Sequence, residues 1–386
     1  MKFNKWTLGL AAVGAVSMAS AVRADEAKMS QLNTALSNTT ISGVVDVGYN
    51  QQLGDVRTGD FHATRNSAHF FTPPYGIGNY SDGFTLNQLL ISLDKPLDDS
   101  PWASGYHVDL NWGDSAVNYN NNTATSPSTG GAPIRQAYVT LRTPVGNGID
   151  WKIGVQDGIT GYEANTLSAN PNYSRSYGWQ VNPASLTGII GTYKIIDAIS
   201  VQAGLVNRNY IEAFAQSDAK LQERGYVFAA AFTAPDSFGF LKGSSLNLQT
   251  IQGFDNDSVD NYSASVSLAT PVAGLRFGAV VDVVQSLAAH QDGNIWGFYG
   301  TYQQTDKLGY ALRAEYINGS DFQFGTFTSG VQKHGEELTA TVSYNLWANV
   351  LTRVEARWDH SENAAAFYSA GYHDAFLLAA NVAYKF

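Results

Sequence analysis

Charged side chains recur at alternate positions near the end of this 386-residue chain. Arg353, Glu355 and Arg357 alternate with mostly apolar residues, and Arg313 and Glu315 repeat the spacing earlier. Because successive side chains of a β-strand point to opposite faces, each set would lie on one face of a strand. Rows of opposite charge create a field that orients polar solutes and sets ion preference. The pattern therefore predicts a charged wall that selects among ions and polar solutes.

Residues for bond-making chemistry are harder to find. His360, His373 and Asp374 resemble part of a hydrolase site, with Ser361 or Ser369 as the nucleophile. A nucleophile needs a base and an orienting group in a recognisable setting, and no flanking motif supplies one. We therefore predict no catalytic residue.

Metal binding has as little support. Residues 255–260 have carboxylates spaced somewhat like a calcium loop, but they lack its glycine and its final glutamate. The chain contains no cysteine, which excludes thiol chemistry and zinc sites built from cysteine. We predict no metal and no cofactor.

The N-terminus has the pattern of a secretory signal peptide. Lys2 and Lys5 precede an apolar stretch over residues 6–19, and cleavage sites with small residues follow at Ala21 and Ala24. The predicted division of the chain is a signal peptide over 1–24, a short periplasmic segment over 25–38 and a β-barrel over 39–386.

Composition narrows the class further. The chain has 37 Gly, 21 Tyr, 19 Phe and 8 Trp, yet only 44% of its residues are hydrophobic. After the signal peptide no run approaches the roughly 20 apolar residues of a membrane-spanning helix. Removing Lys2, Lys5 and Arg23 with the signal peptide leaves 20 of the 23 basic side chains against 33 acidic ones. Nucleic acid is therefore not an expected partner.

Period-two alternation between turn signals divides the rest of the chain into strands. Sixteen are predicted: 40–50, 84–94, 104–113, 134–142, 149–156, 185–194, 198–207, 224–233, 243–252, 261–269, 274–284, 294–303, 308–317, 335–345, 349–359 and 374–386. Connections after the even strands are short and contain Pro or Gly in several places, whereas most of those after the odd strands are long and polar. This asymmetry predicts an antiparallel up-and-down transmembrane barrel with short periplasmic turns and long extracellular loops.

Charge placement favours a barrel over a soluble sandwich. In strand 349–359 the charged residues share one parity, and Val350, Val354 and Trp358 lie on the other. An Arg or Lys facing lipid at mid-bilayer costs about 2–4 kcal/mol, which accounts for this segregation. Aromatic residues such as Trp112, Tyr193 and others gather near strand ends, as in the interfacial girdles of barrels.

The last strand carries a further sign of its destination. Its final residue, Phe386, resembles the signal that the outer-membrane insertion machinery reads in bacterial barrel proteins. We expect export to the outer membrane of a Gram-negative bacterium. The expected partners there are the barrel-insertion machinery, outer-membrane lipid and lipopolysaccharide.

Four segments resemble a known family. They are FTLNQLLISLDKPLD at 84–98, WASGYHVD at 102–109, IRQAYVTLRTPVGNG at 134–148 and NPNYSRSYG at 170–178. They are similar to the β-barrel porin-2 (OmpL-like) family of bacterial outer-membrane proteins. The resemblance covers most of the mature chain and is most specific over about 84–195. It implies a porin-type channel, and the more remote likeness to general porins implies a homotrimer.

Sixteen strands enclose a lumen too wide for side chains to fill, so an aqueous channel results unless something blocks it. General porins narrow it with the loop between strands 5 and 6, which corresponds here to 157–184. The candidates for the constriction are Asp157, Glu163 and Arg175 on this loop, facing Arg142, Lys152, Arg276, Arg313, Glu315, Arg353, Glu355 and Arg357 on the wall.

Two alternatives stay open for this lumen. The charges are equally consistent with ion pairs within the wall, and the connection 51–83, with His62, Arg65 and His69, is a rival for the inserted loop. The leading function is passive diffusion of small hydrophilic solutes and ions. The others are a plugged barrel that acts as a receptor or structural protein, and a carbohydrate-preferring channel whose loop aromatics stack on sugars.

Overall fold

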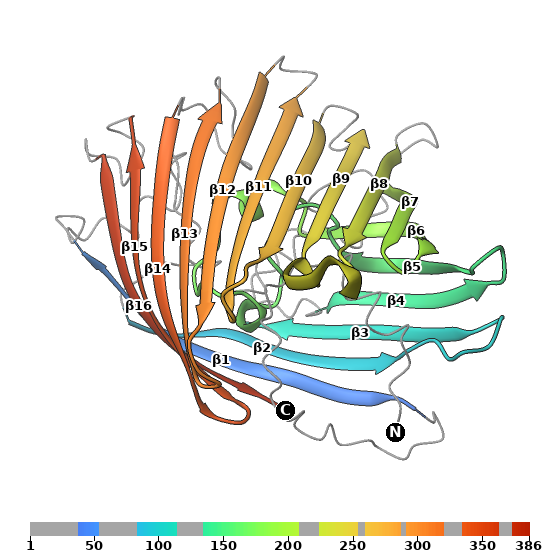
Figure 1. Cartoon of the computed structure of the whole chain (residues 1–386), viewed down its shortest axis with the longest axis horizontal. Coiled ribbons are helices and arrows are strands. Elements are labelled where there is room, and N and C mark those ends of the chain that lie inside the picture. The colour runs from blue at the N-terminus through green and yellow to red at the C-terminus, as the bar shows by residue number, and fades with distance from the viewer. Residues whose placement is uncertain are drawn as a thin grey trace, which may run out of the picture.

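The computed structural model describes residues 38–53, 83–113, 134–207, 224–253, 259–286, 291–319, 334–362 and 373–386. Within these residues sixteen strands form one closed antiparallel barrel, because each strand pairs with its chain neighbours and β1 pairs with β16 (Figure 1). The strands are β1 (Thr40–Leu53), β2 (Gly83–Lys95), β3 (Ser104–Trp112), β4 (Ile134–Thr143), β5 (Ile149–Asp157), β6 (Ser185–Ile196), β7 (Ile199–Asn207), β8 (Arg224–Thr233), β9 (Ser245–Gly253), β10 (Val259–Ala269), β11 (Leu275–Ser286), β12 (Gln291–Gln303), β13 (Leu308–Gly319), β14 (His334–Trp347), β15 (Val350–Ser361) and β16 (Asp374–Lys385).

The predicted barrel is confirmed. The sixteen strands within the described ranges are those read from the alternation, and no predicted strand end lies more than three residues from the observed one. Connections that follow even-numbered strands gather at one end, called here the turn end, where β16 also finishes. The opposite end is called the loop end. At the closure, Val47 of β1 pairs with Val382 of β16.

The two faces of the wall differ as a membrane requires. Along β16, Leu378 and Val382 are 45% and 50% exposed on the outside, whereas Leu377 and Asn381 are 1% and 3% exposed on the inside. Apolar side chains thus face outward and polar ones face inward over much of the barrel, which suits lipid outside. No helix in the described part of the chain is long and apolar enough to span a membrane.

Several predictions fall on residues outside the described ranges. These are the signal peptide over 1–24, almost all of the segment 25–38, the rival loop with His62, Arg65 and His69, and most of the acidic segment 255–260. Ser369 also lies outside them. His360 is described, and its Nδ1 lies 2.9 Å from Oδ1 of Asp374.

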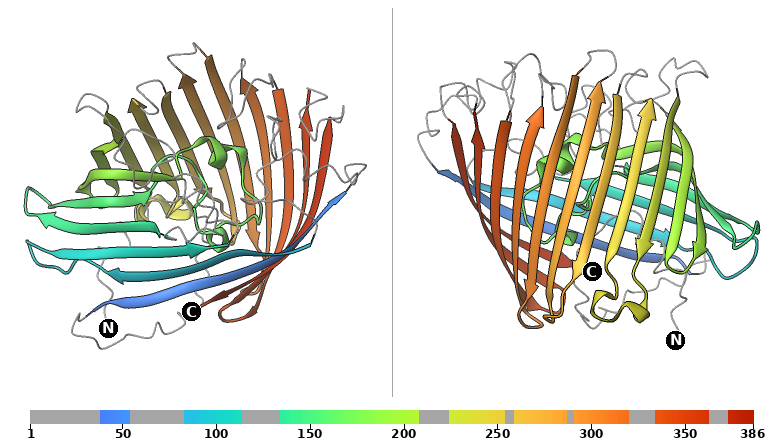
Figure 2. Two further views of the ribbon diagram at one scale, coloured as in Figure 1. Left: turned by 180° about the vertical axis from the view of Figure 1, so that it is seen from behind. Right: turned by 45° about the horizontal axis from the view of Figure 1, so that its top comes forward.

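Residues 158–184, called the lumen loop, run from β5 to β6 through the inside of the barrel. Figure 2 shows this green segment enclosed by strands from both views. It contains two short helical turns, η6 (Leu167–Ala169) and α2 (Tyr177–Val181). At the start of α2, the Ser176 side chain accepts a hydrogen bond from the backbone N–H of Trp179 at 2.9 Å, which satisfies a donor that the helix leaves free.

Candidate functional site

The lumen loop is held by guanidinium groups of the opposite wall. The name wall arginines is used here for Arg313 on β13 and for Arg353 and Arg357 on β15. Nη1 of Arg313 donates to the Ser174 carbonyl at 2.7 Å, and Nη1 of Arg357 donates to the Arg175 carbonyl at 2.6 Å. Arginine suits this role because its fixed fork of five donors reaches several acceptors at once.

Arg353 binds an earlier part of the loop, before Ser174. Its Nη1 donates to the carbonyls of Asn170 at 2.9 Å and Asn172 at 3.0 Å, and its Nε donates to Oδ1 of Asn381 at 3.0 Å. The loop here lacks regular secondary structure, so its carbonyls need partners from elsewhere. The wall arginines supply them.

Carboxylates between these arginines bind the N–H groups of the same loop. Glu355 on β15 accepts from the backbone N–H of Tyr173 at 2.6 Å and of Ser174 at 2.9 Å. Glu315 on β13 accepts from Tyr177 at 2.7 Å and Gly178 at 3.0 Å. Hydrogen bonds to charged groups are worth about 1.5–3 kcal/mol, more than neutral ones. The alternating charges therefore match the alternating donors and acceptors of a peptide backbone.

Aromatic residues of the lumen loop extend to other parts of the wall. Tyr173 donates its hydroxyl to Asn87 on β2 at 3.0 Å, and Tyr177 donates to Asp359 on β15 at 2.8 Å. Tyr162 stacks on Tyr299 of β12 with ring centroids 4.2 Å apart. Burial raises the pKa of Tyr162, Tyr173 and Tyr177, because a phenolate would lose its hydration. These phenols thus remain protonated.

Glycines in the wall make room for two of these rings. A Cβ at Gly278 of β11 would lie 2.0 Å from the hydroxyl oxygen of Tyr162, and a Cβ at Gly48 of β1 would lie 2.6 Å from that of Tyr173. Real Cβ atoms essentially never come so close. The wall is therefore hollowed where the lumen loop contacts it.

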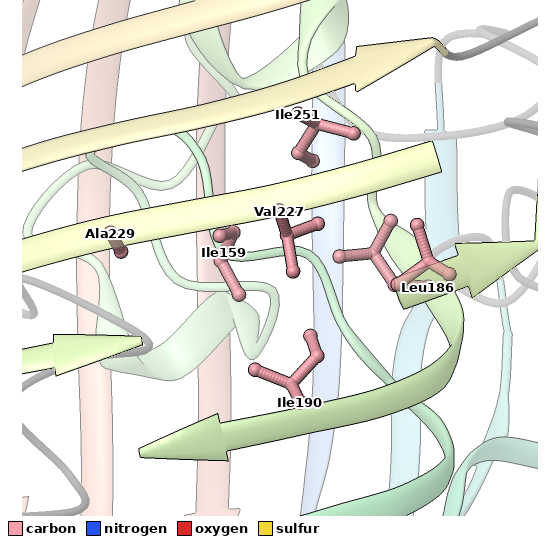
Figure 3. Packing of buried hydrophobic residues seen from close by; sticks show 7 residues of the cluster. Ile159, Leu186, Ile190, Val227, Ala229 and Ile251 are labelled. Carbon is pink, nitrogen blue, oxygen red and sulfur yellow. The ribbon is translucent and has the colours of Figure 1, made fainter. Parts of the chain in front are cut away.

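Apolar packing fixes the base of the lumen loop. Ile159 lies among inward-facing residues of β6 to β9, shown in Figure 3: Leu186, Ile190, Val206, Val227, Ala229 and Ile251. All are 8% exposed or less. Burying such side chains stabilises by about 1.5–3 kcal/mol each relative to exposure. Near the end of the lumen loop, Val181 packs with Val284, Ile295 and Ile317.

Seven of the predicted constriction residues meet in one buried network. These are Glu163 and Arg175 of the lumen loop with Arg313, Glu315, Arg353, Glu355 and Arg357 of the wall. The wall arginines are only 0–2% exposed, and they contact the loop itself. Arg175 donates to the carbonyls of Ala164 and Asn165, and its guanidinium lies 4.4 Å from the Trp179 ring centre.

The other four predicted residues lie elsewhere. Nε of Arg142 is 2.6 Å from Oδ1 of Asp150 near the turn end, and Arg276 donates to the Gly243 carbonyl at 2.9 Å. Asp157 pairs with Arg135 where the lumen loop begins. Lys152 on β5 points into the lumen with its Nζ 4.9 Å from the Tyr138 ring centre.

Several members of the buried network were not predicted as site residues. Glu337 on β14 is 3.2 Å from Arg313, and Asp46 on β1 lies 3.5 Å from Arg353. Asp359 pairs with Arg357 at 2.7 Å. Each is a carboxylate in the inward parity of its strand, so parity alone could have marked them. The partners of Glu337 and Asp46 could not be read from sequence, because they lie on other strands, whereas Asp359 and Arg357 are two residues apart on β15.

The inner wall of β2 to β5 carries further charged groups. Its carboxylates are already paired, as in Asp94 with His107 at 2.9 Å and Asp150 with Arg142. Lys152 forms no ion pair with any described residue and is only half-buried. Over the described ranges, no group of three His, Asp or Glu is placed to hold a metal ion.

A sequence profile described as "Putative beta-barrel porin-2, OmpL-like" matches residues 38–386. The chain belongs to this family. The resemblance seen in the sequence is thereby confirmed. A search of curated proteins found no match.

Solved structures agree on the porin fold. OmpF of Salmonella typhi, in complex with daunomycin, matches with a TM-score of 0.58 and 12% identity over 92% of this chain and 99% of that one. The outer membrane channel DcaP of Acinetobacter baumannii gives 0.56 and 12% over 90% and 97%. The anion-selective porin of Comamonas acidovorans gives 0.54 and 11% over 90% and 99%.

Family membership answers three of the expectations. The chain is a porin-like channel of the outer membrane, as the alternation of apolar and polar residues and the last strand predicted. Its family consists of channels, so the expectation that it is not an enzyme is confirmed as well. The identities of 11–12% carry the fold alone, and they leave the solute to be argued from the site.

Proposed function

We propose that this porin allows passive diffusion of small hydrophilic solutes and ions through a lumen that the lumen loop narrows. One observation carries the proposal: residues 158–184 cross the interior of a sixteen-strand barrel and dock on the opposite wall. A barrel of this size holds an aqueous channel by default. A fixed loop inside it reduces the cross-section without needing to move.

The path of the solute follows from what the loop does not cover. Many of its hydrogen bonds to the wall go to β13 and β15. Polar inward residues that stay half-buried gather on β3 to β7: His107, Tyr138, Thr140, Lys152, Thr192 and Gln202. We assign the passage to the space between this wall and the lumen loop.

Within this proposal the predicted constriction residues have two roles. The wall arginines, with Glu315 and Glu355, position the lumen loop and do not touch the solute. Lys152 faces the passage, and an ammonium without a carboxylate partner attracts anions. The proposed selectivity is thus a preference for anions, set by the half-buried ammonium group of Lys152.

Planar-bilayer recording of the detergent-purified protein tests the channel. Stepwise openings are the expected result. Liposome swelling with sugars of increasing size then gives the width of the passage. Silent membranes and liposomes that do not swell would contradict passive diffusion.

A plugged barrel is the second candidate, and a specific observation favours it. Ile190, Val227 and Ile251 face inward but are 0–2% exposed, so water is excluded from the inner wall of β6 to β9 near Ile159. The carbohydrate-preferring alternative has no such support. The loop aromatics Tyr162, Tyr173, Tyr177 and Trp179 are only 2–6% exposed. The three tyrosines already contact the wall, and Trp179 contacts Asn165 and Arg175 of the loop itself.

Assembly belongs to the same proposal. We propose a homotrimer, inserted by the barrel machinery through the C-terminal Phe386. Phe386 exchanges backbone hydrogen bonds with Gly43 of β1 at 2.9 and 3.0 Å, so its ring ends the strand that closes the barrel. Chemical cross-linking in intact outer membranes should give a ladder that ends at three chains. A ladder that ends at one chain would contradict it.

A further inference from the structure

The outer wall of the barrel contains a groove of about 800 Å³ between β5 and β11. Fourteen of the residues that line it belong to two rows of laterally paired residues. One row is Trp151, Gly191, Ala203, Phe228, Thr250, Tyr262 and Val283, and the other is Ile149, Tyr193, Val201, Ala230, Leu248, Ala264 and Val281. The groove therefore crosses seven neighbouring strands.

These rows lie on the outside of the barrel. Phe228 and Leu248 are 48% and 51% exposed, whereas their chain neighbours Val227 and Asn247 are 0% and 2% exposed toward the lumen. In a strand the two parities lie on opposite faces, so the groove faces the membrane. It has no connection with the proposed solute path.

Side-chain size explains the hollow. Gly191 on β6 pairs with Ala203 on β7, and these two small residues adjoin Trp151 and Phe228 in the same row. A Cβ at Gly191 would lie 2.7 Å from the Trp151 ring, so the indole leans over this glycine. Small residues thus form the floor, and larger side chains form the rims.

The groove begins at the turn end and rises along the barrel. Ile149 is the first residue of β5, whereas Val283 lies eight residues from the turn end of β11. Six strand spacings of about 4.8 Å make it roughly 29 Å long. Its lower end holds Tyr193, whose hydroxyl accepts a hydrogen bond from the backbone N–H of Asn147 at 3.5 Å. An aromatic ring with a polar tip is typical of a membrane interface.

We propose that this groove binds one acyl chain of a phospholipid from the periplasmic leaflet. The short connections predict that the turn end lies in the periplasm, so the headgroup would lie beside Tyr193 and the chain would rise between the rims. An unfilled apolar groove would forfeit dispersion contacts with its lining, and the bilayer offers no water to fill it. A second barrel would meet the raised Phe228 and Leu248 first and leave the floor at Gly191 empty. A flexible chain reaches that floor.

Native mass spectrometry of the full-length porin, extracted in mild detergent, tests this proposal. The filling variant Ala203→Phe/Ala230→Phe places two rings in the groove. Its matched control, Ala314→Phe/Ala356→Phe, adds the same rings to outward positions on β13 and β15. Both variants keep an apolar lipid-facing surface, so both are expected to fold. A change in gel mobility between heated and unheated samples shows whether they have folded.

The expected result is one phospholipid retained by the wild type and by the control, and at least tenfold less by the filling variant. Incubation of delipidated protein with dioleoyl phosphatidylethanolamine in mixed micelles should restore it only in the first two. Equal retention in all three proteins, or none in the wild type, overturns the proposal. Retention of lipopolysaccharide instead would also overturn it. So would an oligomer that only the filling variant breaks, since the groove would then belong to a second copy.

Discussion

Nη1 of Arg313 on β13 lies 2.7 Å from Oε1 of Glu163 in the lumen loop, although 150 residues separate them in the chain. Both side chains are buried, with 0% and 2% of their surfaces exposed. This pair ties the lumen loop to β13, so we expect the width of the proposed passage to depend on it.

Replacing Arg313 should loosen the lumen loop. Arg313→Gln leaves the Glu163 carboxylate without its cation, and removal of one partner of a buried pair costs about 3–5 kcal/mol. We expect larger, noisier single-channel conductance and a lower free energy of unfolding in urea. Arg276→Gln, at a more exposed arginine of the same inner wall, is the control. Unchanged conductance in Arg313→Gln would mean that the pair does not position the loop.

Gly278 offers a test that alters no charge. In Gly278→Ala the new methyl group would lie 2.0 Å from the Tyr162 hydroxyl, so the ring must leave its place on Tyr299. Overpacking of this kind costs about 1–3 kcal/mol. Urea unfolding should show the loss, and conductance should rise. Gly300→Ala, where the nearest atom is 3.7 Å away, should behave as wild type.

Lys152 should set the ion preference. One unit charge at 4 Å in water is worth about 1 kcal/mol, or roughly a fivefold change in the anion-to-cation permeability ratio. Reversal potentials in a salt gradient should therefore shift toward cations in Lys152→Gln and further in Lys152→Glu. Lys307→Glu, in the turn between β12 and β13, is the matched control. A shift of equal size in the control would mean that Lys152 does not face the passage.

The wall arginines should influence selectivity only through the loop. Arg353→Lys keeps the charge but cannot reach the carbonyls of Asn170 and Asn172 with a planar fork. We expect altered conductance with an unchanged reversal potential. A changed reversal potential at unchanged conductance would place Arg353 in contact with the ions.

Export gives a separate prediction. N-terminal sequencing of the protein from outer membranes should find a mature chain that starts at residue 22 or 25, after one of the two cleavage sites. An intact Met1 would contradict the predicted signal peptide.

The fold could be predicted because the bilayer imposes a local rule. Lipid outside and polar surroundings inside force alternation in every strand, and turn residues mark its ends, so strands such as 224–233 are recovered without error. The correspondence with general porins indicated 157–184 as the inserted loop, whereas length alone favoured the rival connection 51–83. That local rule does not describe what an inward side chain meets. Arg353 has the predicted parity, but it contacts a loop that lies about 180 residues earlier.

The groove on the outside of β5 to β11 could not be predicted from the sequence either. It depends on which residues the strand register places side by side, and its small residues, such as Ala203 and Ala230, look like ordinary lipid-facing positions. Glu337 and Asp46 show the same limit inside the barrel. Their charge and parity are local, whereas their pairing with Arg313 and Arg353 depends on strand order and tilt.

The docking of the lumen loop has a consequence for how the barrel reaches its final state. The loop is synthesised well before β13 and β15, and both its donors and its acceptors need them. A slip of β15 by one residue would turn Arg353 and Arg357 toward the hydrocarbon and leave the loop with no anchor. We therefore expect the loop to dock only after β13 and β15 have paired in the correct register and the barrel has closed.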